Sequence, residues 1–132
     1  IIYAYGGFRI MSVYLSEILA TYWPEASWSM LDEDYGQLNW NSDDIPKPTL
    51  EEVNQKITEH SSIKAFSILR RERDRLLTES DWTQMPDVPE ATRTAWQTYR
   101  QALRDLPSTA TPVMDNKTEL CISGVTWPTK PE

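Results

Sequence analysis

Side chains that could act as a catalytic base, a nucleophile or a metal ligand are few in this sequence. His60 is the only histidine and Cys121 the only cysteine. General-base catalysis needs a base facing a nucleophile, yet His60 stands at an expected helix end beside Ser61 and Ser62, and adjacent helical residues do not face each other. We therefore expect His60 to be a solvent-facing residue without a catalytic role. The sequence predicts that the chain is not an enzyme.

Ligand sites for a metal or a phosphate group are not expected either. The acidic clusters 32–34 and 43–44 lack the alternating spacing of a calcium loop, so we interpret them as solvated turns. One histidine and one cysteine do not provide the three or four ligands of a zinc site. The chain has four glycines and no G-x-x-x-x-G-K motif, which excludes a glycine-rich phosphate loop. No cofactor and no metal are predicted.

Charge and composition limit the classes of partner. The 13 basic and 20 acidic residues give a net charge of −7 at pH 7, which argues against nucleic acid or an anionic membrane as the main partner. A single cysteine cannot form an internal disulfide, so we expect folding in a reducing cytoplasm. No stretch approaches the roughly 20 apolar residues of a membrane span. Six Trp and six Tyr indicate a tight core or a polypeptide partner, because such rings bury large areas.

The first half of the chain predicts a helix followed by an aromatic β-hairpin. Ser12 suits an N-cap, and apolar residues recur at helical spacing from Leu15 until Pro24. Large and polar residues then alternate on both sides of a polar turn that contains Gly36. Residues 1–10 are interpreted as an extension upstream of a start at Met11, or alternatively as an edge strand. Three hairpin aromatics are expected to be exposed and to bind a partner: Trp28, Tyr35 and Trp40.

The middle of the chain predicts helices. Thr49 and Glu52 form a T-x-x-E capping box, and the helix that they start is expected to end near residues 60–62, where short polar side chains compete for the backbone. A second helix is expected from Ile63 to about Thr78. A third is expected to close at Pro107 and to form an αα-hairpin with the second. The facing apolar stripes are Ile63, Phe66, Leu69, Leu76 and Leu77 on one helix and Trp96, Tyr99, Leu103 and Leu106 on the other.

Arg73 interrupts an apolar row, because it lies four positions from both Leu69 and Leu77. A buried guanidinium needs an acceptor, which Asp81, Asp87 or a carbonyl of the turn is expected to supply. Arg73 is therefore interpreted as a structural clamp of the hairpin. The surrounding basic run leaves a helix-turn-helix nucleic-acid binder as a weaker alternative.

These elements predict an α+β fold in three parts. Residues 1–48 form a small α+β unit, residues 49–107 a helical unit with the αα-hairpin, and residues 108–132 a proline-rich extended tail. Within the tail, the strand candidate is Leu120 to Trp127, with Gly124 as a bulge or turn. The tail is expected to lie extended on a surface or to be a flexible arm.

The segment from Leu69 to Pro107, together with Val125 to Pro131, resembles the phage tail assembly chaperone, or tail-fibre assembly, family. That family carries the pattern R-x-x-R-D-x-L-L-x-x-x-D-W followed by W-x-x-Y-R-x-x-L-R-D. The matching positions are Arg70, Arg73, Asp74, Leu76, Leu77, Asp81, Trp82, Trp96, Tyr99, Arg100, Leu103, Arg104 and Asp105.

The resemblance implies a bacteriophage tail-fibre-associated protein that binds a fibre or tail protein and assists its assembly in the bacterial host cytoplasm. A permanent structural subunit of the virion tail fibre is the alternative. Binding is expected through the hairpin aromatics and through strand addition near either terminus. The partner's identity and the oligomeric state stay open. Together with Arg73, four motif residues are expected to lock the hairpin rather than to touch a partner: Asp81, Trp82, Trp96 and Tyr99.

Overall fold

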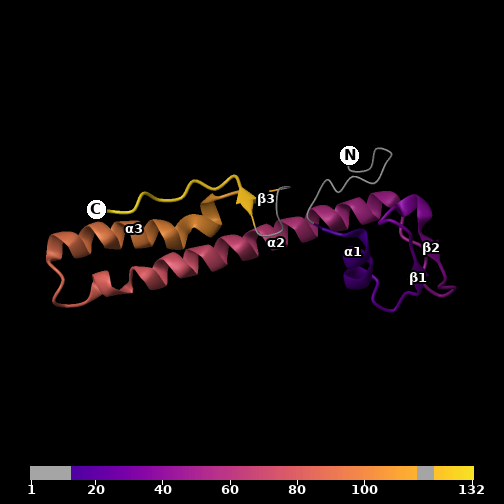
Figure 1. The fold of residues 1–132 in the computed structure, drawn as a ribbon, viewed down its shortest axis with the longest axis horizontal. Helices are drawn as coiled ribbons and strands as arrows, with labels where there is room; N and C mark the ends of the chain where they lie inside the picture. Colours follow the sequence, from indigo (N-terminus) through magenta and orange to yellow (C-terminus); the bar gives the residue numbers. More distant parts are fainter. Residues whose placement is uncertain (1–12, 116–120) are drawn as a thin grey trace. The chain divides into compact units, whose positions relative to one another are not determined.

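The computed structural model describes residues 13–115 and 121–132 (Figure 1). The predictions for residues 1–10, for the N-cap Ser12 and for Leu120 lie outside these described residues. Three α-helices, two short 3-10 helices and two small two-stranded sheets are present in the described part. The fold is therefore α+β, as predicted.

The chain divides into two compact units. Unit 1 comprises Ile1–Lys64 and Met114–Cys121, and unit 2 comprises Ala65–Val113 and Ile122–Glu132. The division falls within the long helix α2 (Leu50–Glu79), which contributes its first part to unit 1 and the remainder to unit 2. The divisions that the sequence predicts after residues 48 and 107 stay a prediction.

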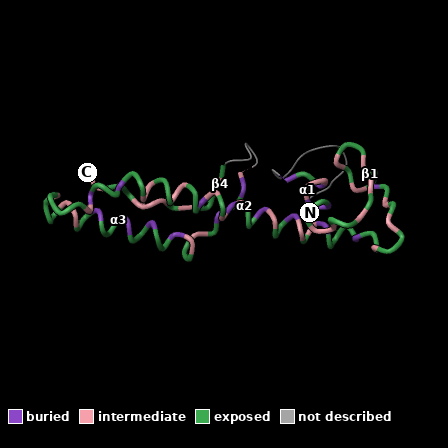
Figure 2. Tube along the Cα trace, turned by 90° about the horizontal axis from the view of Figure 1, so that it is seen from below, coloured by how far each residue is buried: buried purple, intermediate pink, exposed green. Residues whose placement is uncertain are grey.

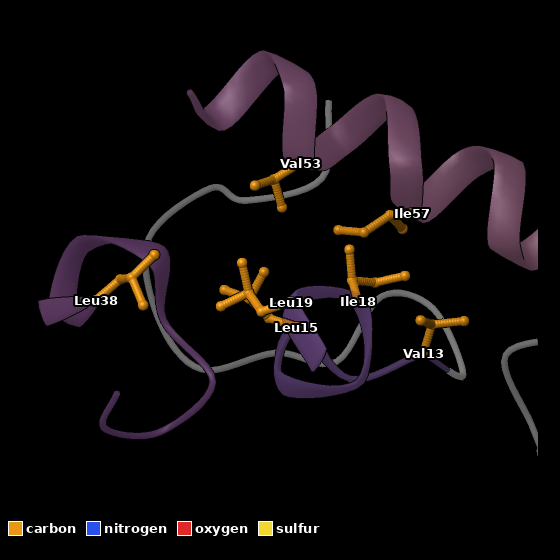
Figure 3. Packing of buried hydrophobic residues seen from close by; sticks show 7 residues of the cluster. All are labelled: Val13, Leu15, Ile18, Leu19, Leu38, Val53 and Ile57. Atoms are coloured by element: carbon orange, nitrogen blue, oxygen red, sulfur yellow. The ribbon is translucent and has the colours of Figure 1, made fainter. Parts of the chain in front are cut away.

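The core of unit 1 forms between α1 and the start of α2. Helix α1 (Leu15–Tyr22) buries three residues of one face, as its spacing predicts. In Figure 3 these side chains point toward Val53 and Ile57 of α2. Full burial of an aliphatic side chain contributes about 1.5–3 kcal/mol, so burial of this cluster stabilises unit 1. Its buried members are Val13, Leu15, Ile18, Leu19, Leu38, Val53 and Ile57.

The amino end of α1 is capped from a distant part of the chain. Tyr14 occupies the N-cap position and makes no side-chain cap hydrogen bond. Instead, the carboxylate of Glu33 accepts from the backbone amide of Ser16 at 2.8 Å and from its hydroxyl at 2.6 Å. A carboxylate at this end also opposes the positive pole of the helix dipole.

The predicted aromatic hairpin is present, with very short strands. Strand β1 (Trp28–Ser29) pairs antiparallel with β2 (Asn39–Trp40), and Trp28 lies opposite Trp40. The connection between them contains the 3-10 helix η1 (Tyr35–Gln37). Asp34 caps η1, because its carboxylate accepts from the Gly36 amide at 2.9 Å.

Helix α2 starts at the predicted capping box but does not end where expected. The Glu52 carboxylate accepts from the Thr49 amide at 2.7 Å, and the Thr49 hydroxyl accepts from the Glu52 amide at 3.2 Å. The predicted end at residues 60–62 is wrong, because the helix continues to Glu79. Ser61 is buried there. Tertiary packing therefore outweighs the weak helix preference of serine.

Helix α3 (Glu90–Thr109) lies beside the second part of α2 in unit 2 (Figure 1). Figure 2 shows buried segments recurring along α3, which is the periodicity of an amphipathic helix. The buried core of unit 2 consists of Leu69, Trp96, Tyr99, Leu103 and Leu106. The predicted αα-hairpin is thus present.

Two details of the hairpin differ from the prediction. Ile63, expected on the buried stripe, is 59% exposed. Pro107 does not close α3 but lies within its last turns. A proline there removes a single amide donor, and the helix still ends with a bond from the Ala110 amide to the Leu106 carbonyl at 2.8 Å.

The tail contributes a second small sheet and packs on unit 2. Strand β3 (Val113–Met114) pairs with β4 (Ile122–Ser123). Gly124 follows with a φ of 75°, at the position predicted for a bulge or turn. Beyond it, Val125 and Trp127 pack partly buried against the unit 2 core.

Over the two described ranges, no helix is both long enough and apolar enough to cross a membrane.

Candidate functional site

The aromatics expected to bind a partner all contact the core of unit 1. Trp28, Tyr35 and Trp40 are partly buried against it. The Tyr35 hydroxyl donates to the Pro48 carbonyl at 2.6 Å, and the Trp40 indole donates to the Ile45 carbonyl at 2.7 Å. Burial, with a contribution from the charge of Glu52, raises the pKa of Tyr35. These polar atoms are used internally, and the partner-binding role of the three rings stays a prediction.

His60 does not lie at a helix end, so the expected solvent-facing position was wrong. It is partly buried in the middle of α2, where its Nε2 lies 3.0 Å from Glu17 Oε1. Its ring packs edge-on against Tyr22 at 6.1 Å. His60 therefore links α2 to α1 within unit 1. In the described part of the chain, no group of three or more His, Cys, Asp or Glu side chains could hold a metal ion.

The turn between α2 and α3 is the 3-10 helix η2 (Asp81–Gln84). Thr83 is fully buried, and its hydroxyl donates to the Ser80 carbonyl at 2.6 Å. Pro86 and Pro89 follow, and neither has an amide that could continue a helix. The connection between the two helices thus begins with a hydrogen-bonded 3-10 turn and continues as a proline-containing segment.

Arg100 fixes this turn from α3. Arg100 is only 8% exposed. Its Nη1 donates to the Leu77 carbonyl at 2.6 Å and to the Ser80 hydroxyl at 2.7 Å. Its Nη2 donates to Asp81 Oδ1 at 2.7 Å. The last turn of α2 has no basic residue of its own, so Arg100 supplies the positive charge that favours a helix carboxyl end.

The sequence predicts Arg73 as the clamp of the hairpin and gives Arg100 no such role. The clamp role of Arg73 stays a prediction. Arg73 donates to its neighbour Asp74 at 2.9 Å, whereas Asp81, one acceptor expected for it, binds Arg100. The signal was available in the sequence, because Arg100 lies four positions after Trp96 and three before Leu103. It therefore interrupts the apolar stripe of α3 as Arg73 interrupts that of α2.

Three aromatic rings predicted to lock the hairpin lie in a row beside the turn. The rings of Trp82 and Trp96 are 5.9 Å apart, and Trp96 meets Tyr99 edge-on at 5.6 Å. The Lys130 ammonium lies 5.6 Å from the Trp96 ring centroid. Trp96 and Tyr99 are buried, but Trp82 is 56% exposed. The row thus anchors one tryptophan that still presents much of its surface to solvent.

Met85 adds a second exposed apolar side chain to this turn. It is 56% exposed, and its amide donates to the Trp82 carbonyl at 3.2 Å. We name the exposed side chains of Trp82 and Met85 the turn surface. An apolar group held on a pinned turn is a typical anchor for a polypeptide partner, because little conformational freedom is lost on binding.

The basic run on α2 is largely compensated within its own helix. Arg75 binds both Glu72 and Glu79, and hydrogen bonding from Arg75 lowers the pKa of Glu72. Arg73 binds Asp74, and Arg70 lies over the Phe66 ring. Arg73 and Arg75 are thus paired with carboxylates of their own helix, and the nucleic-acid alternative stays a prediction.

Comparison with known proteins places the hairpin in a family. The family model described as phage tail assembly chaperone protein matches residues 66–132, which is half of the chain and includes the turn surface, Arg100 and the tail. No curated protein and no solved structure matches the chain. A role in phage tail assembly follows from the family. The chain belongs to the phage tail assembly chaperone protein family.

Proposed function

We propose that this chain is a non-enzymatic protein that binds a phage tail-fibre or tail protein in the bacterial host cytoplasm and assists its assembly. The family supplies the setting of phage tail assembly. The polypeptide-binding mode, the fibre as partner and the absence of catalysis are our proposal.

The observation that carries the proposal is the exposure of Trp82 on a turn that Arg100 holds in place. The sequence predicts only a hairpin-locking role for Trp82, and we propose that it also binds the partner. Trp82 is 56% exposed although its ring contacts the buried Trp96. Tryptophan is enriched among the residues that dominate binding energy at protein interfaces. A fixed turn also lowers the entropy lost on association. The turn surface is therefore suited to bind a polypeptide.

Coexpression with the tail-fibre protein of the same phage tests this function. We expect the yield of soluble, assembled fibre protein to rise when the chain is present and to fall back with Trp82→Ala. The matched control is Leu31→Ala, because Leu31 is 60% exposed and lies in unit 1. An equal yield with and without the chain contradicts an assembly role for this fibre protein.

Quantitative mass spectrometry of purified virions separates a transient helper from a permanent subunit. A helper leaves the particle, so we expect far fewer copies of the chain than of the fibre protein. Equal copy numbers favour the alternative, a structural subunit of the tail fibre.

A further inference from the structure

We infer that the turn surface binds a basic polypeptide segment that carries an apolar anchor side chain. This inference rests on the proposed function and adds the chemistry of the partner. Two independent properties of the hairpin turn support it, its exposed apolar groups and its charge.

The exposed apolar groups of the turn favour an apolar side chain of the partner as its anchor. Trp82 and Met85 are each 56% exposed and lie within one turn of η2, joined by a backbone hydrogen bond. Methionine is flexible and polarisable, so it adapts to differently shaped side chains. The Trp82 ring offers a rigid apolar face beside it. A leucine, phenylalanine or methionine of the partner would bury its side chain against this pair.

The charge of the turn determines which partner residues are favoured beside the apolar anchor. Residues 79–90 contain no Lys, Arg or His. The segment has four acidic side chains, which are Glu79, Asp81, Asp87 and Glu90. Glu79 binds Arg75, and Asp81 binds Arg100. Within residues 13–115 and 121–132, Asp87 and Glu90 have no ion-pair partner. Two uncompensated carboxylates close in sequence to an apolar anchor favour lysine or arginine in the partner.

Lys130 provides an intramolecular example of the expected contact. Its ammonium lies over the Trp96 ring, and Trp96 in turn contacts Trp82. Cations are attracted to the faces of aromatic rings. The aromatic row thus already accepts one basic side chain of the tail.

Other occupants fit this charge less well. Phosphate groups of nucleic acid or membrane lipid would be repelled by the acidic turn. A second copy of the chain carries the same net charge of −7, which opposes self-association. A basic segment of another protein is therefore favoured over a phosphate-bearing partner and over a second copy of the chain.

Selection from a random dodecapeptide library on the immobilised full-length chain tests the inference. We expect retained peptides to pair Leu, Phe, Trp or Met with adjacent Lys or Arg. Replacement Trp82→Ala should lower their retention by about 30-fold, the effect of losing an interface residue worth about 2 kcal/mol. The control Leu31→Ala should retain the same peptides as the unchanged chain.

The double variant Asp87→Asn and Glu90→Gln tests the charge separately. The two amides have nearly the same shape as the carboxylates that they replace. We therefore expect the double variant to bind peptides with an apolar side chain but no longer to select those that also carry Lys or Arg. Raising the salt concentration should weaken the same preference. Met85→Ala offers a second apolar test if Trp82→Ala melts at a much lower temperature.

Each outcome decides the inference. Acidic or uncharged peptides that depend on Trp82 overturn the basic partner but leave the proposed function intact. Peptides insensitive to both Trp82→Ala and Met85→Ala, or no enrichment at all, overturn this site. The proposed function itself fails in a different experiment, when fibre assembly does not respond to the chain.

Discussion

The guanidinium of Arg100 on α3 donates to the carbonyl oxygen of Leu77 in the last turns of α2 at 2.6 Å. This bond joins the two helices of the hairpin at the point where the chain reverses. The same carbonyl also accepts from the Ser80 amide at 3.2 Å and from the Ser80 hydroxyl at 3.0 Å, so Arg100 adds a charged donor to the closing turn of α2. Arg100 therefore closes the hairpin and holds the turn that presents Trp82.

Replacement Arg100→Met should destabilise the chain by about 1.5–3 kcal/mol, the range for losing a hydrogen bond to a charged group. Asp81→Asn should cost less than about 1 kcal/mol, because the Asp81 side chain is 65% exposed and water screens its charge. Urea unfolding followed by circular dichroism measures both. Equal losses in the two variants would show that the ion pair, rather than the carbonyl and hydroxyl contacts, carries the effect.

Two neighbouring residues with positive φ should respond to substitution in opposite directions. Asp32 and Glu33 have φ of 55° and 56°, and only Glu33 caps α1. We expect Glu33→Ala to cost about 1 kcal/mol, as for a lost N-cap. Asp32→Gly should raise the free energy of unfolding by a few tenths of a kcal/mol, because glycine adopts positive φ without steric cost. Thermal melting checks the signs, and a neutral Glu33→Ala contradicts the capping role.

The capping box predicts a dependence of stability on pH. Hydrogen bonds from the backbone and then the side chain of Thr49 lower the pKa of Glu52. The folded carboxylate thus stays ionised at a lower pH than the unfolded one. Its contribution is present above the unfolded pKa, roughly 4.3, and is lost as pH falls through the lower folded pKa.

Urea midpoints of the unchanged chain and of Glu52→Gln, taken from pH 7 to pH 3, measure this contribution. The difference between the two proteins should shrink as the pH falls. A difference that is constant over the whole range is inconsistent with an ionised cap.

Gly124 should tolerate no side chain. Its φ is 75°, and a Cβ there would lie 2.5 Å from the Thr111 carbonyl oxygen. We expect Gly124→Ala to cost more than about 1 kcal/mol, from positive φ alone. The control Gly36→Ala would meet the movable Asp34 carboxylate at 3.3 Å and should stay within about 0.5 kcal/mol. Similar melting temperatures for both variants would argue against the close approach at Gly124.

Features that depend on nearby residues were predictable from the sequence. The apolar face of α1, the presence of an aromatic hairpin and the capping box at Thr49 follow from spacing and local hydrogen bonding. The stripe of α3 likewise predicted its partner on α2, because the two apolar rows match. For these elements, residue spacing and local hydrogen bonding contain the information.

Features that depend on distant contacts were not predictable in the same way. Within α2, His60 contacts Glu17, which lies 43 residues earlier in the chain, and local spacing does not indicate such a contact. The choice between Arg73 and Arg100 as the clamp depends on which one reaches the end of α2. Both interrupt an apolar stripe, and only the packed hairpin distinguishes them. Exposure of Trp82, on which the candidate site rests, is also a property of the packed turn.

The central claim is that the chain binds a tail or tail-fibre protein through the turn surface, and quantitative copurification with the fibre protein of its phage tests it most directly. We predict that Trp82→Ala lowers the copurified amount at least tenfold, a loss of about 1.4 kcal/mol in binding, while Leu31→Ala leaves it unchanged. The double variant Trp28→Ala and Trp40→Ala tests the other aromatic surface. Unchanged copurification with a folded Trp82→Ala variant would contradict the claim.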